Sequence, residues 1–296
     1  MGSEMCIRDS IKIMKNFFRI SVVIVISISL LVIGLPRILN SMGLNPEYEG
    51  QSVELINKRA LIITTSHSVL SKADEIKGKK TGVWGAEMTH PYYTFLDGGM
   101  EVDIASILGG SIPIDPDSFS YFVISPEDKR YLEDPVAQAK ANNSIPISEV
   151  DIKEYDIIFI AGGWGAAYDL AQSPVLAKKI TESYYSIKNP IIGGVCHGVL
   201  GLVNARDREG NLLISGRLMT GVTDKQIDEL GINFTPKHPE TELRKAGAIF
   251  ESESAFRDIF ATHVSVDNDK RFVTGQNQNS GLETAHTMMR LISMRN

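Results

Sequence analysis

The chain has 296 residues, of which 43% are hydrophobic and 22% charged, and its formal net charge is −6. These values are ordinary for a globular core and leave room for one full α/β domain plus an appendage. The negative charge, without basic clusters, argues against nucleic-acid binding. The only cysteines, Cys6 and Cys196, exclude a disulfide framework and a cysteine-rich zinc site, so Cys196 is expected to be a free thiol.

An apolar run near the N-terminus predicts a membrane segment. Residues 20–35 are almost wholly apolar, and with Phe17 and Phe18 the run reaches 19 residues, enough to cross a bilayer as a helix. Basic residues precede the run and only Arg37 follows it closely, so the positive-inside bias puts the N-terminus in the cytoplasm. No small-x-small cleavage site follows, which favours an uncleaved anchor over a cleaved signal peptide.

The sequence therefore divides into four parts. Residues 1–16 are a cytoplasmic segment or a remnant foreign to the natural protein, since the chain opens like an export signal only at Met14. Residues 17–39 are the transmembrane anchor or signal peptide, 40–57 a polar linker and 58–296 the α/β domain. This domain is expected outside the cytoplasm, anchored to the membrane or released after cleavage of the signal.

Strands and helices alternate through the domain. Buried strands are predicted at 59–65, 156–161 and 190–195, and further strands at 101–106, 248–251, 261–266 and 271–274. Helices are predicted at 91–96, 134–141, 173–186, 240–246 and 281–294, with polar loops at 66–80 and 111–117. Alternation of this kind indicates a mostly parallel sheet covered by helices on both faces.

The stretch 190–198, Pro-Ile-Ile-Gly-Gly-Val-Cys-His-Gly, organises the domain. A buried strand meets small residues and turns into a second apolar run, which is the layout of a nucleophile elbow. Cys196 lies at the bend, where the N-terminus of the following helix is expected to lower the pKa of its thiol and favour the reactive thiolate. The alternative is a buried structural cysteine beside a turn.

A second strand end carries the glycines Gly162 and Gly163, followed by Trp164. In open α/β sheets, ligands bind beyond the carboxyl ends of the strands. Glycines directly after a strand can present backbone N–H groups to an oxyanion, as acyl-transfer and carbonyl chemistry require. A plain tight turn is the alternative, but beside an elbow cysteine we favour the anion-binding role.

Several stretches together resemble the ThiJ/PfpI superfamily, which is related to the class I glutamine amidotransferases. They are Gly-Val-Trp-Gly-Ala-Glu-Met-Thr-His-Pro-Tyr at 82–92, Pro-Ile-Asp-Pro at 113–116, Ala-Gly-Gly-Trp-Gly at 161–165, Gly-Val-Cys-His-Gly at 194–198 and Thr-Gly-Gln-Asn at 274–277. The resemblance covers roughly residues 59–295 and looks nearest to the glyoxalase III and heat-shock chaperone branch. It implies a flavodoxin-like, doubly wound three-layer sandwich and a homodimer.

The resemblance also implies roles for individual residues. Cys196 matches the nucleophile, His197 its companion and Glu87 the early acid that contacts the thiol. A carboxyl group buried beside a thiolate would have a raised pKa and stay protonated. Asp224 matches the position where a related subgroup places the aspartate of a Cys-His-Asp triad, and is the alternative partner of His197.

The implied reaction is that of a cysteine-dependent glyoxalase III of the D-lactate dehydratase type. It converts 2-oxoaldehydes such as methylglyoxal into 2-hydroxy acids without metal or organic cofactor, and deglycase or chaperone activity in the stress response would be an addition. Gly162, Gly163 and Trp164 would bind the substrate or its oxyanion. The branch commonly has histidine where Trp164 stands, which puts the substrate range in question more than the chemistry.

Other functions remain open at this stage. Glutamine amidotransferases share the elbow and complete a triad with His-x-Glu, a pattern that 238–240 (His-Pro-Glu) fits, although these residues also read as a helix start. A peptidase, a holdase chaperone or a thiol sensor oxidised at Cys196 are further alternatives. Glu87, His90 and His67 match no standard zinc spacing, so no metal site is expected.

Overall fold

The computed structural model describes residues 2–73 and 75–295, with side chains from Met14 onward. The chain forms two units, Met1–Met42 and Gly43–Asn296. Helix α1 (Gly2–Ser41) makes up the first and so begins well before the expected 17–39 segment and ends two residues after it. Its part Met14–Ser41 is, by length and composition alone, suited to crossing a membrane, a test that a signal sequence would also pass.

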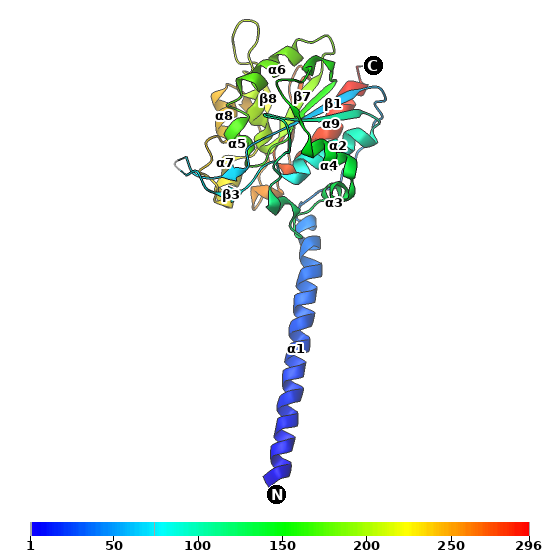
Figure 1. The fold of residues 1–296 in the computed structure, drawn as a ribbon, viewed down its shortest axis with the longest axis vertical. Helices are drawn as coiled ribbons and strands as arrows, with labels where there is room; N and C mark the ends of the chain where they lie inside the picture. Colours follow the sequence, from blue (N-terminus) through cyan, green and yellow to red (C-terminus); the bar gives the residue numbers. More distant parts are fainter. Residues whose placement is uncertain (1, 74, 296) are drawn as a thin grey trace. The chain divides into compact units, whose positions relative to one another are not determined.

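A seven-stranded sheet forms the centre of the second unit (Figure 1). All neighbouring strands pair in parallel except the first two in the spatial order, which are antiparallel. In that order the strands are β10 (Val264–Val266), β11 (Phe272–Gly275), β7 (Ile191–Val195), β6 (Ile157–Ile160), β1 (Arg59–Thr64), β4 (Glu101–Ser106) and β5 (Ile145–Pro146). The chain runs outward from β1 to β5 and then returns to the other side of β1, so ligands are expected beyond the carboxyl ends near β1 and β6.

Helices cover both faces of this sheet (Figure 1). Successive side chains of a strand point to opposite faces, and along β1 Ala60 and Ile62 enter one hydrophobic core while Leu61 and Ile63 enter the other. The first core is shared with α2 (Gly85–Asp97), α3 (Pro126–Glu133), α4 (Pro135–Asn142), α7 (Asp224–Leu230) and α9 (Gly281–Ser293); the second with α5 (Ala166–Asp169), α6 (Pro174–Tyr184) and α8 (Pro239–Lys245). The mostly parallel α/β sandwich expected from the sequence is confirmed.

The structure differs from the expectation at the helix that carries Glu87. Helix α2 begins at Gly85, whereas the sequence predicted a helix only from Pro91. Proline lacks the backbone N–H that an interior helical position donates, so Pro91 indicates a helix start. In the structure Pro91 lies inside α2, and Glu87 therefore stands in the first turn of a helix and not in a preceding loop.

One strand prediction and one loop prediction also change. Residues 249–250 form β9 (Ile249–Phe250), which pairs with β8 (Leu218–Met219) in a separate two-stranded sheet and not in the central one. The loop expected at 66–80 contains the short antiparallel pair β2 (Val69–Leu70) and β3 (Lys79–Lys80). A β-branched pattern predicts a strand but leaves its partner open, because pairing depends on the surroundings.

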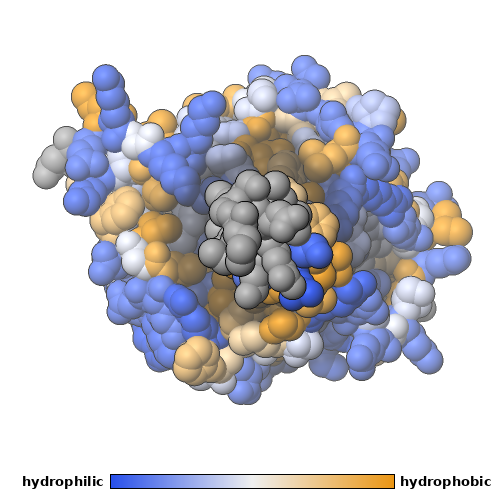
Figure 2. Space-filling model, turned by 90° about the horizontal axis from the view of Figure 1, so that it is seen from below, coloured by the Kyte–Doolittle hydropathy of each residue, from blue (hydrophilic) through white to orange (hydrophobic). Residues whose placement is uncertain are grey.

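The face shown in Figure 2 is largely hydrophilic around its periphery, with hydrophobic residues scattered among the polar ones. Scattered apolar side chains are normal on a protein surface and need no special function.

Candidate active site

Cys196 stands on a sharp bend between β7 and the 3₁₀ helix η3 (Cys196–Leu202). Its φ of 55° lies in the left-handed region, which residues other than glycine rarely adopt. Gly198 makes the bend possible, because a Cβ there would lie 2.1 Å from the carbonyl oxygen of Ile160 in the neighbouring strand. The strand-to-helix elbow expected from the sequence is present, with a 3₁₀ helix as its second arm.

Glu87 reaches the same point from the first turn of α2 and is only 1% exposed. The backbone N–H of Gly162, just after β6, donates a hydrogen bond of 2.9 Å to its Oε2. Its carboxyl group also interacts directly with the Cys196 thiol. Burial raises the pKa of Glu87 to about 8, so this carboxyl group keeps its proton at neutral pH, as the sequence led us to expect.

The thiol of Cys196 does not have the lowered pKa expected of it. Burial raises its pKa well above the ordinary value, and the negative charge of Glu87 raises it further, against backbone N–H groups that act in the other direction. The expectation considered the helix N-terminus but could not include the loss of water around the sulfur. Because an ionised Glu87 opposes ionisation of Cys196, the pair holds at most one negative charge at moderate pH.

His197 is the third polar group at the sulfur. Its Nδ1 lies 3.4 Å from Sγ of Cys196, and burial lowers its pKa to about 3, so the imidazole is neutral. Its Nε2 is buried without a hydrogen-bond partner. The ring of Trp164 lies against it, with ring centroids 4.9 Å apart and planes inclined by 55°. A neutral imidazole in this position can accept a proton from the thiol.

Two backbone N–H groups are directed at the sulfur, those of Gly163 and His197. Gly163 has a φ of 96°, which favours glycine. The N–H of Gly162, by contrast, is already bonded to Glu87. Of the two glycines expected to hold an oxyanion, the geometry therefore leaves Gly163 available and commits Gly162 to the carboxyl group.

Asp224 does not hydrogen-bond His197, contrary to the alternative triad. Its Oδ1 is 4.0 Å from Nδ1 of His238, and its Oδ2 accepts a 2.7 Å hydrogen bond from Thr241. The cause is its place as first residue of α7, from which the carboxylate turns toward the start of α8. Glu240 is likewise occupied, since it accepts hydrogen bonds from the N–H of Asp224 and from Arg244. The structure thus leaves the His-x-Glu triad unformed as well, and places His238 at the start of α8 instead.

A pocket of about 180 Å³ opens onto Cys196. It lies at the carboxyl ends of the parallel strands, as such folds predict. Its lining also includes residues that the sequence analysis did not identify. These residues come from turns that are distant in sequence, so no local sequence pattern indicates that they share a pocket. The lining residues are Trp84, Glu87, Asp117, Gly163, Trp164, Cys196, His197, Val222, Gln226, Leu230, Ile232, Ile259 and Gln278.

The histidines weighed as metal ligands lie elsewhere. His67 stacks on Tyr168 with ring centroids 4.2 Å apart, and the buried His90 lies 3.4 Å from the carboxylate of Glu127. Within the described part of the chain no group of three or more histidine, cysteine, aspartate or glutamate side chains is arranged to hold a metal ion. Cys196 is a free cysteine, and Cys6 lies outside the described side chains.

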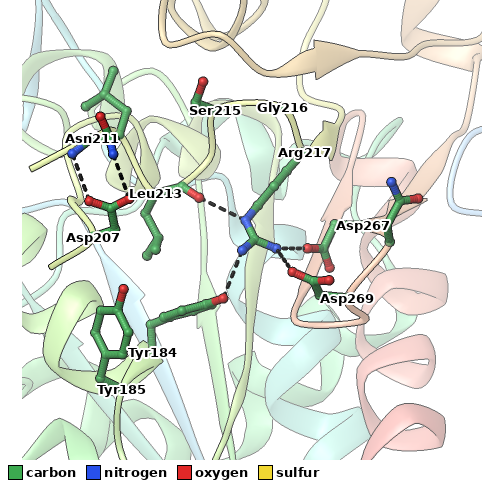
Figure 3. A pocket seen from close by; sticks show the side chains of 12 residues that line it. Tyr184, Tyr185, Asp207, Asn211, Leu213, Ser215, Gly216, Arg217, Asp267 and Asp269 are labelled. Carbon is green, nitrogen blue, oxygen red and sulfur yellow. Dashed lines mark hydrogen bonds and ion pairs between the residues drawn. The ribbon is translucent and has the colours of Figure 1, made fainter. Parts of the chain in front are cut away.

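A larger hollow of about 540 Å³ lies near the amino ends of β7 and β11 and is polar (Figure 3). Its centre is Arg217, which donates hydrogen bonds of 2.9 Å to the carbonyl of Leu213 and 2.8 Å to the hydroxyl of Tyr184. It also pairs with Asp267 and Asp269. These partners occupy the guanidinium, so the cluster reads as a structural one and the pocket at Cys196 remains the candidate active site.

Comparison with known proteins agrees with this geometry. Curated relatives include "Glyoxalase 3" of Candida albicans, 29% identical over 242 residues that cover 78% of this chain and 97% of the relative. "Glutathione-independent glyoxalase HSP31" of Saccharomyces cerevisiae is 28% identical over 237 residues, covering 77% of this chain and 95% of the relative.

Solved structures also resemble this chain over most of its length. Rapid Encystment Protein 24 KDa of Francisella tularensis matches with a TM-score of 0.71 and 33% identity, over 79% of this chain and 99% of that one. Glyoxalase III of Candida albicans matches with a TM-score of 0.69 and 29% identity, over 79% and 97% of the two chains. Residues 81–291 match the DJ-1/PfpI family. The chain, with its elbow cysteine and seven-stranded sandwich, therefore belongs to the DJ-1/PfpI family.

Proposed function

We propose that this protein is a cofactor-independent glyoxalase of the glyoxalase III type, which uses Cys196 to convert 2-oxoaldehydes such as methylglyoxal into 2-hydroxy acids. The observation that carries the proposal is the meeting of a thiol, a carboxyl group of raised pKa and a neutral imidazole in one pocket. The relatives named as glyoxalases, matched over nearly their whole length, support it.

In the first step, the sulfur of Cys196 adds to the aldehyde carbon and a C–S bond forms. The thiol proton passes to the carboxylate of Glu87 or to Nδ1 of His197, which lies 3.4 Å from Sγ. The aldehyde oxygen takes up the negative charge beside the N–H groups of Gly163 and His197, and is protonated to give a hemithioacetal.

In the next step, the base removes the proton from the former aldehyde carbon, and the resulting enediol is protonated at the neighbouring carbon. One carbon is thereby oxidised and the other reduced, so no external oxidant is needed. Water then cleaves the thioester and releases the 2-hydroxy acid and the thiol. Glu87 is suited to this shuttling because its pKa of about 8 lets it gain and lose a proton near neutral pH. His197 is neutral and so has a ring nitrogen free to accept a hydrogen bond or a proton during the reaction.

The test is formation of lactate from methylglyoxal without glutathione, by the wild-type chain and by Cys196→Ala. We expect the variant to lose at least about a hundredfold in kcat. Ile187→Ala, a change at a fully exposed side chain, serves as the matched control. Wild-type turnover in Cys196→Ala would refute the mechanism, and suppression of client aggregation that survives in this variant would indicate a holdase activity separate from the pocket.

We further propose that Met14–Ser41 is a membrane anchor that holds the domain outside the cytoplasm. Its 28 residues would span about 42 Å as a helix, more than the roughly 30 Å of a bilayer core. Membrane fractionation followed by protease treatment of intact cells tests this proposal: protection of the domain, or its recovery in the soluble fraction with residues 1–42 removed, would contradict an external anchored domain. The homodimer stays a prediction, to be tested by light scattering in detergent.

A further inference from the structure

The pocket at Cys196 has mostly apolar walls. Aromatic rings come from the residue before α2 and from the turn after β6, and aliphatic side chains come from both ends of α7 and from the 3₁₀ helix η4 (Asp258–Phe260). Because these elements are distant in sequence, the apolar lining is a property of the folded pocket and not of one local segment. The side chains are Trp84, Trp164, Val222, Leu230, Ile232 and Ile259.

Positive charge is missing from this lining. Among the described residues that form the pocket none is lysine or arginine, and the carboxyl groups present are those of Glu87 and Asp117. Asp117 is more than half exposed and pairs with Lys79, which is not part of the lining. A substrate with a negatively charged tail would meet no counter-ion in the pocket and would lose its hydration there.

The space exceeds what a methyl group needs. The volume of about 180 Å³ would hold several water molecules, whereas methylglyoxal adds only one methyl group to the two carbonyls that react. Trp164 narrows the side next to His197, with its ring centroid 4.9 Å from the imidazole. The remaining space is bordered by the aliphatic side chains of Leu230, Ile232 and Ile259.

We propose that the preferred substrates are 2-oxoaldehydes whose ketone carbon bears a branched or extended apolar group, and that Leu230 and Ile259 are specificity-determining residues for that group. This inference rests on the proposed glyoxalase function. The chemical steps are unchanged, and only the group on the ketone carbon differs. Burial of apolar surface contributes roughly a fourfold gain in kcat/KM for each fully buried methylene.

The experiment compares three aliphatic 2-oxoaldehydes with the full-length chain in detergent: methylglyoxal, the analogue with a 2-methylpropyl group, and one of similar length that ends in a carboxylate. The alkyl series keeps the reactivity of the dicarbonyl nearly constant. We expect kcat/KM to rise about tenfold from methyl to 2-methylpropyl if about half of the added surface is buried. We expect the carboxylate analogue to fall below methylglyoxal.

Two variants test whether the side chains of Leu230 and Ile259 cause the preference for the 2-methylpropyl substrate. Leu230→Ala and Ile259→Ala should each lower the 2-methylpropyl to methyl ratio by about threefold or more, and Ile187→Ala should leave it unchanged. Using two variants, each checked for folding by circular dichroism, guards against a loss caused by unfolding. A ratio at or below one in the wild type, or an unchanged ratio in both folded variants, overturns the specificity proposal while glyoxalase activity stands. Absence of turnover with every oxoaldehyde overturns the proposed function itself.

Discussion

At the scale of single residues, the site depends on one proton shared between Glu87 and Cys196. Burial raises the pKa of both groups, so the resting pair is neutral below about pH 8 and carries one negative charge above it. A protonated carboxyl group cannot take the proton of the thiol. The reaction is therefore expected to speed up as Glu87 loses its proton.

We predict that kcat/KM of the wild type rises with pH through about 8, the pKa of Glu87. In Glu87→Gln, which keeps the shape of the side chain but cannot titrate, this rise should disappear, and activity above pH 8 should fall by roughly 10²–10⁴. The pH profiles of both proteins with methylglyoxal measure this. A wild-type profile that is flat from pH 7 to 9 would show that Glu87 is not the base.

The orientation of Asp224 leads to a second prediction. Because the Nε2 of His197 has no hydrogen-bond partner and the Asp224 carboxylate bonds to Thr241, Asp224→Asn should lower kcat by less than about tenfold. His197→Ala removes the group next to the sulfur and should cost about 10²–10⁴. Steady-state kinetics give kcat for both variants and so compare the two losses. Equal losses would mean that Asp224 reaches His197 during turnover.

At the scale of elements, the elbow depends on a close approach between η3 and β6. Gly198→Ala would put a Cβ 2.1 Å from the carbonyl oxygen of Ile160, and backbone cannot move aside as a flexible side chain can. We predict a loss of about 1–3 kcal/mol or more in the free energy of unfolding. Gly110→Ala is the comparison, since its Cβ meets open space and its φ of 78° alone costs about 1–2 kcal/mol.

Denaturant unfolding of the two glycine variants measures the difference. A loss of less than about 1 kcal/mol in Gly198→Ala would mean that the elbow relaxes around the added methyl group, and the close contact would then have no energetic role. A lower stability for Gly198→Ala together with reduced turnover would connect the packing of η3 to the position of the thiol.

The elements also show what the sequence could and could not predict. The strand patterns at 59–65, 101–106 and 156–161 predicted β1, β4 and β6 almost to the residue, and the glycines around Cys196 predicted the bend. Helix α2 was placed too late because Pro91 imitates a helix start. The pKa of Cys196 and the direction of Asp224 depend on burial and on neighbours that come from distant segments, which no local pattern contains.

At the scale of the whole molecule, buried histidines make the fold sensitive to acid. Burial lowers the pKa of His90 from 6.5 to about 4. The unfolded chain therefore binds this proton first, and the stability that the neutral imidazole contributes above pH 6.5 is lost as the pH falls toward 4. His197, with a pKa lowered to about 3, acts in the same direction.

We predict that the free energy of unfolding falls by about 2 kcal/mol per such histidine between pH 6.5 and 5. The variant His90→Gln should lack the contribution of one histidine to this loss. Urea titrations at pH 8 and pH 5 measure this change in the free energy of unfolding. At pH 8 the imidazole is neutral in the folded and in the unfolded chain, so the values at pH 8 give the effect of the substitution on packing alone. A slope that is unchanged in His90→Gln would contradict the assignment.

The Arg217 cluster (Figure 3) lies near the amino ends of β7 and β11, whereas Cys196 follows the carboxyl end of β7. It joins the end of α6, through Tyr184, to the turn before β11, through Asp267 and Asp269. Substitution of Arg217 would therefore lower the stability of the fold, and with it the amount of protein that escapes degradation. The kcat of the protein that remains folded would be unchanged. Substitutions in this cluster should therefore lower the amount of protein in the cell, and inhibition of proteolysis should restore that amount.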